Sequence, residues 1–473
     1  MNVLKSLFKD TVIYGLASVI PRLVNILLVG LHTQVLSVSS FSVNTSFYVY
    51  AAFANVVLTY GMETAFFRFY SREKQSQKVF TTLLVALFTS TCVVFGASLF
   101  FIENIGAFFG LPPTTLGLLL GVIFFDTLSV PGYVFLRIQG KSLLFMAIKM
   151  IWLLIYVSIN VCFLGLPEIF TKYLDLWDSS QQVNYIFLAN LLGSSVVLLC
   201  VTPYYLKQKW VFDRELFKKM LYYGLPIMGA GLAFTINEHL DKLLIKKFLG
   251  KETMGAYSAC YKLSVFLTLF IQAFRLGVEP IIFKHFKSDN AKDTYALILK
   301  YFTSFAVLGV LIVMSYLDFL KGLLIRDESY WFAINAIPII LVANVCLGIY
   351  YNLSTWYKVI DKTYFGLYFS LIGALITIIG NSIFIPKYGY IAAAYCTLLA
   401  YGVMMVLSFS MGQKKYPIPY ATLQISGYIL LGLSLAFLNY YYLVAYPIFK
   451  AINIIFYVSL LLFIAYKNRR NTI

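Results

Sequence analysis

Charged side chains make up only 12% of this chain of 473 residues, about half the share found in ordinary soluble domains. Hydrophobic residues make up 60%, and the mean hydropathy is +0.81. A soluble core cannot hide that much apolar surface. The composition therefore excludes an ordinary soluble protein and indicates that lipid surrounds most of the chain.

Cysteine and histidine are also scarce, with 6 and 3 residues. No pair of them has the spacing of a zinc site or a redox motif, so we expect neither a metal nor another cofactor. A glycine-rich phosphate loop and a nucleophile motif are missing as well. The longest segment on the predicted outer side, residues 165–183, is too short for a catalytic domain. We therefore do not expect an enzyme, and a membrane glycan polymerase is a remote alternative.

Long apolar runs, in contrast, are abundant. One transmembrane helix needs about 20 apolar residues, and continuous rather than alternating runs favour helices over a β-barrel. The runs lie at 11–32, 44–67, 80–102, 114–136, 144–164, 184–206, 219–240, 254–280, 297–320, 330–354, 364–386, 389–411, 420–438 and 446–466. We predict an all-α polytopic membrane protein with about fourteen transmembrane helices.

The basic residues are distributed unevenly between the two predicted sides of the membrane. The net charge is +17, which by itself is also typical of nucleic-acid binding. With the N-terminus in the cytoplasm, however, most Lys and Arg fall on cytoplasmic segments, such as 207–219 and the end of the chain at Arg469 and Arg470. This asymmetry follows the positive-inside rule. It predicts that both termini are cytoplasmic and that the partner is membrane lipid rather than nucleic acid.

The two halves of the chain resemble each other. "GMETAFFRFY" at 61–70 closes one apolar run, and "GVEPIIFKHF" at 277–286 closes another. "YGLASVIPRLVNILLVG" at 14–30 and "YGLPIMGAGLAFTINEH" at 223–239 begin with the same three residues. Each half contains an even number of predicted helices, so both copies enter the membrane in the same sense, as in transporters built from parallel repeats.

The repeat predicts a domain organisation. We expect an N-terminal lobe at 1–206, a basic cytoplasmic linker at 207–218, a C-terminal lobe at 219–412 and two additional helices at 413–473. Two pseudo-symmetric lobes of six helices each would leave a cleft between them, and transporters of this kind bind their substrate there.

These motifs, together with "FRLGVEPIIFKHF" at 274–286, resemble the O-antigen or lipid-linked oligosaccharide flippases of the multidrug/oligosaccharidyl-lipid/polysaccharide exporter superfamily. The resemblance covers nearly the whole chain and is densest in predicted helices 1, 2, 7 and 8. It implies a MATE-like V of two lobes and a lipid-linked glycan substrate. It also implies arginines from helices 1 and 8 in the central cavity, as in related flippases.

Two arginines lie deep in apolar runs, where an ionised side chain costs about 2.5–3.5 kcal/mol on insertion scales. Arg22 shares a helical face with Asn25 in the first run, directly after Pro21, and His32 continues that face. Arg275 lies in the eighth run on a long polar face that includes Gln272. We interpret both faces as substrate-binding, the alternative being arginines paired with carboxylates for packing.

Other charges have less specific interpretations. Lys149, on a stripe with Trp152, Tyr156 and Asn160, either lines the substrate site or extends towards the membrane surface. Asp126 either neutralises Arg22 or Lys149 or binds a coupling proton or sodium ion.

Four charges are matched between the halves: Glu63 with Glu279, and Arg68 with Lys284. Arg22 and Arg275 have no such counterparts. A matched charge is more consistent with a scaffold or a gate at the cytoplasmic mouth, whereas an unmatched cation is more consistent with ligand binding.

The resulting prediction is a flippase in a bacterial cytoplasmic (inner) membrane. It would translocate a polyprenyl-diphosphate-linked oligosaccharide to the outer leaflet by alternating access, for surface polysaccharide or lipopolysaccharide O-antigen assembly. Contact with glycan assembly proteins is an expected partnership. A lipid II flippase and a multidrug or cation antiporter of the same superfamily remain alternatives.

Overall fold

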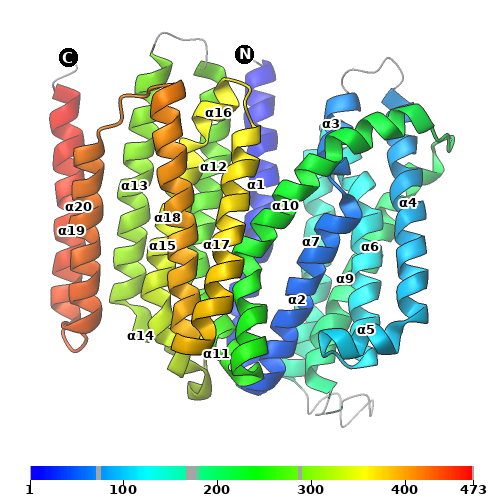
Figure 1. Cartoon of the computed structure of the whole chain (residues 1–473), viewed down its shortest axis with the longest axis horizontal. Coiled ribbons are helices and arrows are strands. Elements are labelled where there is room, and N and C mark those ends of the chain that lie inside the picture. Colours follow the sequence, from blue (N-terminus) through cyan, green and yellow to red (C-terminus); the bar gives the residue numbers. More distant parts are fainter. Residues whose placement is uncertain (1, 71–75, 167–177, 179–180, 286–289, 471–473) are drawn as a thin grey trace. The chain divides into compact units, whose positions relative to one another are not determined.

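The computed structural model of the protein describes residues 2–70, 76–166, 178, 181–285 and 290–470. Within these residues every regular element is a helix. Thirteen helical stretches are long and apolar enough to cross a membrane, from Val12–Val35 near the N-terminus to Pro447–Ile464. The chain is therefore a multi-pass membrane protein, as the composition predicts (Figure 1).

Thirteen of the predicted apolar runs correspond to these stretches. The remaining run, 219–240, lies within helix α10 (Arg214–Leu249), which continues through Pro226. This helix is rich in glycine and polar residues, so its mean hydropathy falls below that of the other spans. The predicted number of about fourteen is thus approximate.

The chain divides by its internal contacts into two compact units, Met1–Gly255 and Ala256–Ile473. The first unit contains α1 (Asn2–Val35), α2 (Val38–Thr59), α3 (Met62–Tyr70), α4 (Ser76–Phe100), α5 (Ile102–Phe109), α6 (Pro113–Ile138), α7 (Ser142–Asn160), a π-helical turn at Val161–Gly165, α9 (Gln182–Leu206) and α10. Helix α10 packs against α2 and α3. The two compact units therefore divide after α10. The linker between two lobes at 207–218 remains a prediction.

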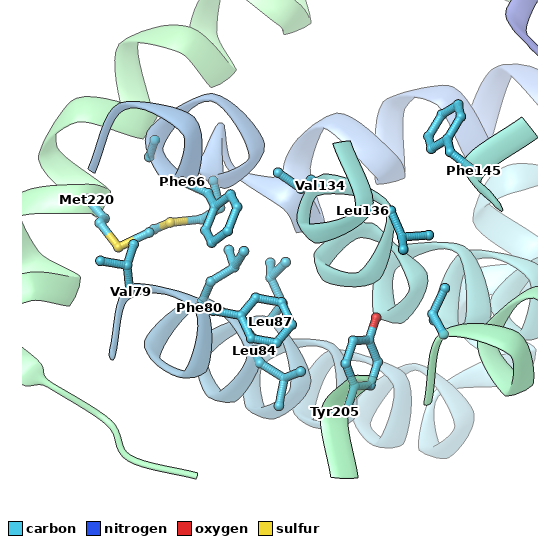
Figure 2. Close-up of a cluster of buried hydrophobic side chains, with 14 of the residues drawn as sticks. Phe66, Val79, Phe80, Leu84, Leu87, Val134, Leu136, Phe145, Tyr205 and Met220 are labelled. Carbon is cyan, nitrogen blue, oxygen red and sulfur yellow. The ribbon is translucent and has the colours of Figure 1, made fainter. Parts of the chain in front are cut away.

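The core of the first unit is built where α3, α4, α6, α9 and α10 meet. Short α3 buries Met62, Ala65 and Phe66, at the spacing of one helical face. Figure 2 shows Phe66 beside Phe80 and Met220, which come from α4 and α10. Lipid tails are as apolar as these side chains, so such contacts stabilise the unit mainly through close van der Waals packing.

A break in the apolar run 44–67 separates α2 from α3. Tyr60 and Gly61 both have positive φ, of 31° and 72°. A left-handed conformation is unfavourable for a tyrosine and ordinary for a glycine. The break ends α2, so that the motif "METAFFRFY" forms a helix of its own.

The second unit starts in α11 (Lys251–Tyr261). It continues through a 3₁₀ turn (Lys262–Ser264), α12 (Val265–His285), α13 (Ala291–Ser315), α14 (Leu317–Leu324), a 3₁₀ segment (Glu328–Ala336), α15 (Ile337–Leu353), α16 (Thr355–Val359), α17 (Tyr364–Tyr388), α18 (Tyr390–Lys415), α19 (Thr422–Tyr441) and α20 (Pro447–Arg470). Helix α15 packs closely against α18, and α18 against α17.

The two additional helices α19 and α20 stand beside α13 (Figure 1). Asn439 of α19 donates from Nδ2 to Ser315 Oγ of α13 at 2.8 Å and accepts from Asn453 Nδ2 of α20 at 2.6 Å. Asn439 and Ser315 are both buried. Such side-chain hydrogen bonds across helices contribute about 0.6–1.7 kcal/mol in membrane proteins, so this network holds the added pair to the unit.

Candidate functional site

Helix α1 carries the first predicted cation. The Arg22 side chain is exposed, and Asn25, one turn further on, is half-buried. The buried amide oxygen of Asn25 accepts no hydrogen bond from the described residues. The polar face does not extend to His32 as predicted. His32 is buried, and its Nε2 lies 2.8 Å from Asn160 Oδ1 of α7. The polar face that remains available to a ligand is therefore shorter than predicted.

The polar stripe of α7 faces other helices of the first unit. Tyr156 Oη lies 3.1 Å from Tyr48 Oη of α2. A side chain on Gly193 of α9 would overlap the indole of Trp152, at 2.7 Å from its Cδ1. Together with the bond between Asn160 and His32, these contacts place the stripe against protein over most of its length.

Lys149 and Asp126 lie on α7 and α6, neighbouring helices of the first unit. The Lys149 ammonium lies 4.4 Å from the centre of the Tyr133 ring of α6, a cation–π distance. The Asp126 carboxylate, also on α6, interacts electrostatically with Lys149 and lies beside Ser194. Asp126 is exposed, and no ion pair joins it to Lys149, so the predicted neutralisation is limited to an electrostatic interaction. A coupling ion at Asp126 remains a prediction.

The two matched charges of the first half, Glu63 and Arg68, contact the end of α6 and helix α10. Glu63 Oε1 lies 2.6 Å from Arg137 Nη1, and both side chains are about half exposed. The Arg137 guanidinium also lies 4.9 Å from the Phe67 ring centre. Arg68 lies 4.2 Å from the centre of the Tyr223 ring of α10. Glu63 and Arg68 therefore connect α3 to two different helices, which is consistent with a scaffold role.

Arg275 of α12 borders a hollow in the second unit. Its guanidinium carbon lies 5.3 Å from the centre of the Tyr351 ring of α15. Besides Arg275 and Tyr351, the hollow is lined by Ile271, Phe274, Val278, Ile282, Asn352, Thr355 and Lys358. Helix α12 contributes Arg275 and the four apolar residues, and the remaining residues come from α15 and α16.

The predicted polar face of the eighth run is interrupted. The 3₁₀ turn at Lys262–Ser264 separates α11 from α12 and changes the helical phase. Tyr257 and Ser264, which the same helical spacing places on this face, are buried, so the first part of the face packs against protein. Gln272 is half-buried, and its Oε1 accepts no hydrogen bond from the described residues. The side chains of Glu279 and Lys284 lie outside the described part.

A second hollow of about 260 Å³ in this unit has a different character. It is lined by Phe266, Leu267, Phe270, Gly309, Ile312, Val313 and Leu320. Because these side chains are all apolar, this hollow offers no group to hold an anion. Among the described residues, no cluster of His, Cys, Asp and Glu is arranged to hold a metal ion.

Lys358, Asn352, Thr355 and Arg137 are not among the predicted site residues. One signal was available for Thr355 and Lys358. Tyr351, Thr355 and Lys358 are spaced i, i+4 and i+7, which is one helical face at the end of the tenth apolar run. Arg137 had no such signal, because its partner Glu63 is 74 positions away in the chain.

Comparisons with known proteins agree with this architecture. A family model described as "Polysaccharide biosynthesis protein" matches residues 7–286, and a model described as MatE matches residues 226–383. An uncharacterised membrane protein of Methanocaldococcus jannaschii is 22% identical over 349 residues, which cover 69% of this chain and 66% of that protein's length.

Two solved structures are similar over most of the chain. The lipid II flippase MurJ in an inward closed conformation has a TM-score of 0.76 and 17% identity, covering 95% of this chain and 98% of that one. An inward-facing multidrug resistance MATE family transporter of the MOP superfamily has a TM-score of 0.65 and 17% identity, covering 87% of this chain and 98% of that one. At this identity, the likeness shows a shared fold.

Proposed function

Since the chain belongs to the polysaccharide biosynthesis protein family and has the fold of MOP-superfamily transporters, we propose that it is a flippase for a lipid-linked glycan. The proposed substrate is a polyprenyl-diphosphate-linked oligosaccharide. It moves from the cytoplasmic to the outer leaflet by alternating access, for the assembly of a surface polysaccharide such as an O-antigen.

The observation that carries this proposal is the placement of Arg22 and Arg275. Both are exposed side chains within candidate membrane spans, where charged residues are rare and mark substrate pathways. A diphosphate is an anion that crosses lipid only if its desolvation is offset. Arginine suits this role because its planar guanidinium stays charged and binds phosphate oxygens bidentately.

The other predicted residues support this assignment in different ways. Asn25 and Gln272 lie near the two arginines in their helices, and each has an amide oxygen without a described partner, so both are candidates for sugar hydroxyls. Lys149 is a weaker candidate because it interacts with Asp126. The charges at Glu63, Arg68, Glu279 and Lys284 are assigned to a scaffold or gate.

The membrane potential favours the proposed direction. With the cell interior negative, moving two negative charges outward gains roughly 4.6 kcal/mol per 100 mV. Asp126 is the candidate for additional coupling to a proton or sodium ion. The proposed location is a bacterial cytoplasmic membrane with both termini inside, where glycan assembly proteins would be neighbours.

A second candidate function is the flipping of lipid II. The observation that favours it is the structural likeness to a lipid II flippase over 95% of this chain. Lipid II is also a diphosphate-linked glycan lipid, so the same arginines would serve it. The two functions differ in the glycan, and the family description, polysaccharide biosynthesis protein, supports the first candidate.

The test is a lipid analysis of a deletion strain. We expect a polyprenyl-diphosphate oligosaccharide to accumulate on the cytoplasmic leaflet and to disappear when the intact gene is restored. Accumulated lipid II would establish the second candidate instead. Normal lipids combined with an altered resistance to cationic dyes would overturn both flippase candidates. That result would support a multidrug transporter, in line with the MatE match at residues 226–383.

A further inference from the structure

The apolar hollow of about 260 Å³ in the second unit interrupts an exposed face of α13. At steps of three, four and seven residues, this face carries the exposed side chains Leu297, Tyr301, Phe305 and Ile312. Gly309 falls on the same face, between Phe305 and Ile312, and lines the hollow. We propose that the hollow binds one acyl chain of a membrane phospholipid. This site goes beyond the proposed function and is separate from the proposed substrate site.

Helix α14 closes one end of the hollow, where Leu320 lines it. Figure 1 shows α14 at the end of the second unit opposite to the C-terminus. On α14, Lys321 Nζ lies 2.7 Å from Asp318 Oδ1 and 4.7 Å from the centre of the Trp331 ring. Tryptophan is enriched at the membrane–water interface, and charged groups are rare deeper in the membrane. The hollow therefore begins at the level where the acyl chains of a phospholipid begin.

From α14, the hollow extends toward the middle of the spans. The 3₁₀ turn before α12 and the end of α13 both contact α14. Phe266 and Phe270 line the hollow from α12, and Gly309 and Val313 line it from α13. The residues of each pair are four positions apart, which is about 6 Å at 1.5 Å per residue. This length suits the first part of an acyl chain rather than a whole lipid.

The chemistry of the hollow selects a hydrocarbon. All of its lining side chains are apolar, so a water molecule there would find no side-chain hydrogen-bond partner. Apolar cavities of about 150 Å³ stay dry and bind hydrocarbons such as benzene. In a bilayer, the molecules next to an exposed face of a span are lipids, and a chain in the hollow restores the van der Waals contacts that an empty space would lose.

Gly309 keeps the hollow open. A glycine in a helix interior destabilises the helix by about 0.5–1 kcal/mol relative to alanine. Close packing of two backbones does not require it here, because the nearest described atom to an added Cβ is Leu267 Cδ1, at 3.4 Å. The glycine instead leaves a gap in the exposed face of α13, at the place where a chain would enter.

The hollow and Arg275 lie on different sides of α12. Phe266 and Arg275 are nine positions apart in this continuous helix, which places them roughly 180° apart around its axis. A lipid whose phosphate groups bind at Arg275 is therefore not directed into the hollow. This separation favours a phospholipid of the bilayer over the chain of the transported lipid.

The test uses the whole protein in phosphatidylcholine nanodiscs, with a small fraction of the lipid carrying a photoactivatable diazirine in the upper part of one acyl chain. After irradiation, peptide mass spectrometry locates the labelled residues. Leu267 and Val313 line the hollow and are only 2% and 7% exposed, so lipid outside the hollow does not reach them. We expect both to be labelled in the wild type. Exposed Phe305 reports ordinary contact with the bilayer.

Gly309→Leu fills the hollow with a side chain. We expect labelling of Leu267 and Val313 to fall about tenfold, which corresponds to about 1.4 kcal/mol of binding free energy, while Phe305 stays labelled. Gly309→Ala, with its Cβ in ordinary contact, should give a smaller decrease and provides the reading if Gly309→Leu does not fold.

The matched control is Gly427→Leu in α19. Gly427 is also an exposed glycine within a candidate span, and an added Cβ there meets no described atom within 4 Å. It adds the same side chain away from the hollow, so its labelling should match the wild type. A similar decrease at Leu267 and Val313 in Gly427→Leu would show that the effect of Gly309→Leu is not local.

Three results would overturn the inference. In the first, the wild type is labelled at Phe305 but at neither Leu267 nor Val313, so that no chain enters the hollow. In the second, Gly309→Leu is labelled like the wild type. In the third, an added long-chain polyprenyl monophosphate removes the label from Leu267 and Val313 alone, which would assign the hollow to a polyprenyl chain. The flippase proposal stands or falls on its own lipid analysis.

Discussion

Gly61 and Gly224 approach so closely that a Cβ on Gly61 would lie 2.2 Å from the Gly224 carbonyl oxygen. Both belong to motifs that the internal repeat singles out, "GMETAFFRFY" and "YGLPIMG". Gly277 occupies the corresponding position in the second half, but it continues helix α12 and has no heavy atom within 4 Å of an added Cβ. The two copies of the motif thus use the same glycine differently, as a helix junction in one and as an ordinary helical position in the other.

Replacing Gly61 by alanine should therefore destabilise the protein by about 1–3 kcal/mol. The new Cβ would meet backbone rather than a flexible side chain, and φ of 72° is strained for alanine. Thermal unfolding in detergent measures the effect. The matched control is Gly277→Ala, which should be neutral or stabilise by about 0.5–1 kcal/mol because alanine favours a helix interior. Equal unfolding temperatures for the two variants would contradict this account of the junction.

The electrostatic interaction of Asp126 with Lys149 gives a second prediction. Because Asp126 is exposed and makes no ion pair with Lys149, Asp126→Asn should destabilise by at most about 1 kcal/mol. The double variant Asp126→Asn with Lys149→Gln should recover most of that loss. Unfolding of the two single variants and the double variant forms a double-mutant cycle.

The same cycle separates pairing from ion coupling. If Asp126 only neutralises Lys149, the double variant should transport with the same dependence on a proton or sodium gradient as the wild type. Loss of that dependence in the double variant, with stability restored, would show instead that Asp126 couples transport to an ion. Transport in vesicles with and without an imposed gradient is the measurement.

The start of α10 predicts a pH effect on stability. The Leu216 amide donates to Asp213 Oδ1 at 3.0 Å and Lys78 Nζ lies 2.9 Å from Oδ2, and together they hold the pKa of Asp213 below its usual value. A lowered pKa means that the ionised carboxylate stabilises the folded state above about pH 4, the value for an unfolded aspartate. This stabilisation is lost as the pH falls through the lower, folded-state pKa.

Unfolding temperatures between pH 3 and pH 7 test this effect. We expect Asp213→Asn to lower stability at neutral pH and to converge with the wild type at the acid end. Glu215→Gln, in the first turn of the same helix and highly exposed, is the control. It should follow the wild-type pH dependence. A constant difference between Asp213→Asn and the wild type at every pH would show that charge at Asp213 is not the cause.

Transport should depend on both arginines. Arg22→Ala and Arg275→Ala are each expected to reduce glycan export at least tenfold, because removing a charge-assisted phosphate contact costs about 1.5–3 kcal/mol. Arg214→Ala is the control, since Arg214 is an exposed arginine at the start of α10, outside the candidate membrane spans. Full export by either Arg22→Ala or Arg275→Ala would remove that residue from the substrate site.

Much of the fold could be predicted from the sequence for a simple physical reason. In lipid, every backbone amide and carbonyl must be hydrogen-bonded within the span, so a continuous apolar run of sufficient length forms a helix. Thirteen such helices follow the predicted runs. The exceptions arose where local backbone geometry intervened: at Tyr60 and Gly61, which end α2, and at the 3₁₀ turn that divides the eighth run.

The sequence does not reveal which residues the polar side chains contact. The sequence by itself determined that Arg22, Lys149 and Arg275 lie in apolar helices and therefore need compensation. Only the tertiary structure decided that Lys149 interacts with Asp126 and that Lys358 shares a hollow with Arg275. Helix neighbours in a membrane are selected by close packing of small side chains and by single hydrogen bonds between distant residues. Such contacts leave no periodic pattern along the chain, so the spans can be recognised from sequence while their pairings require the folded protein.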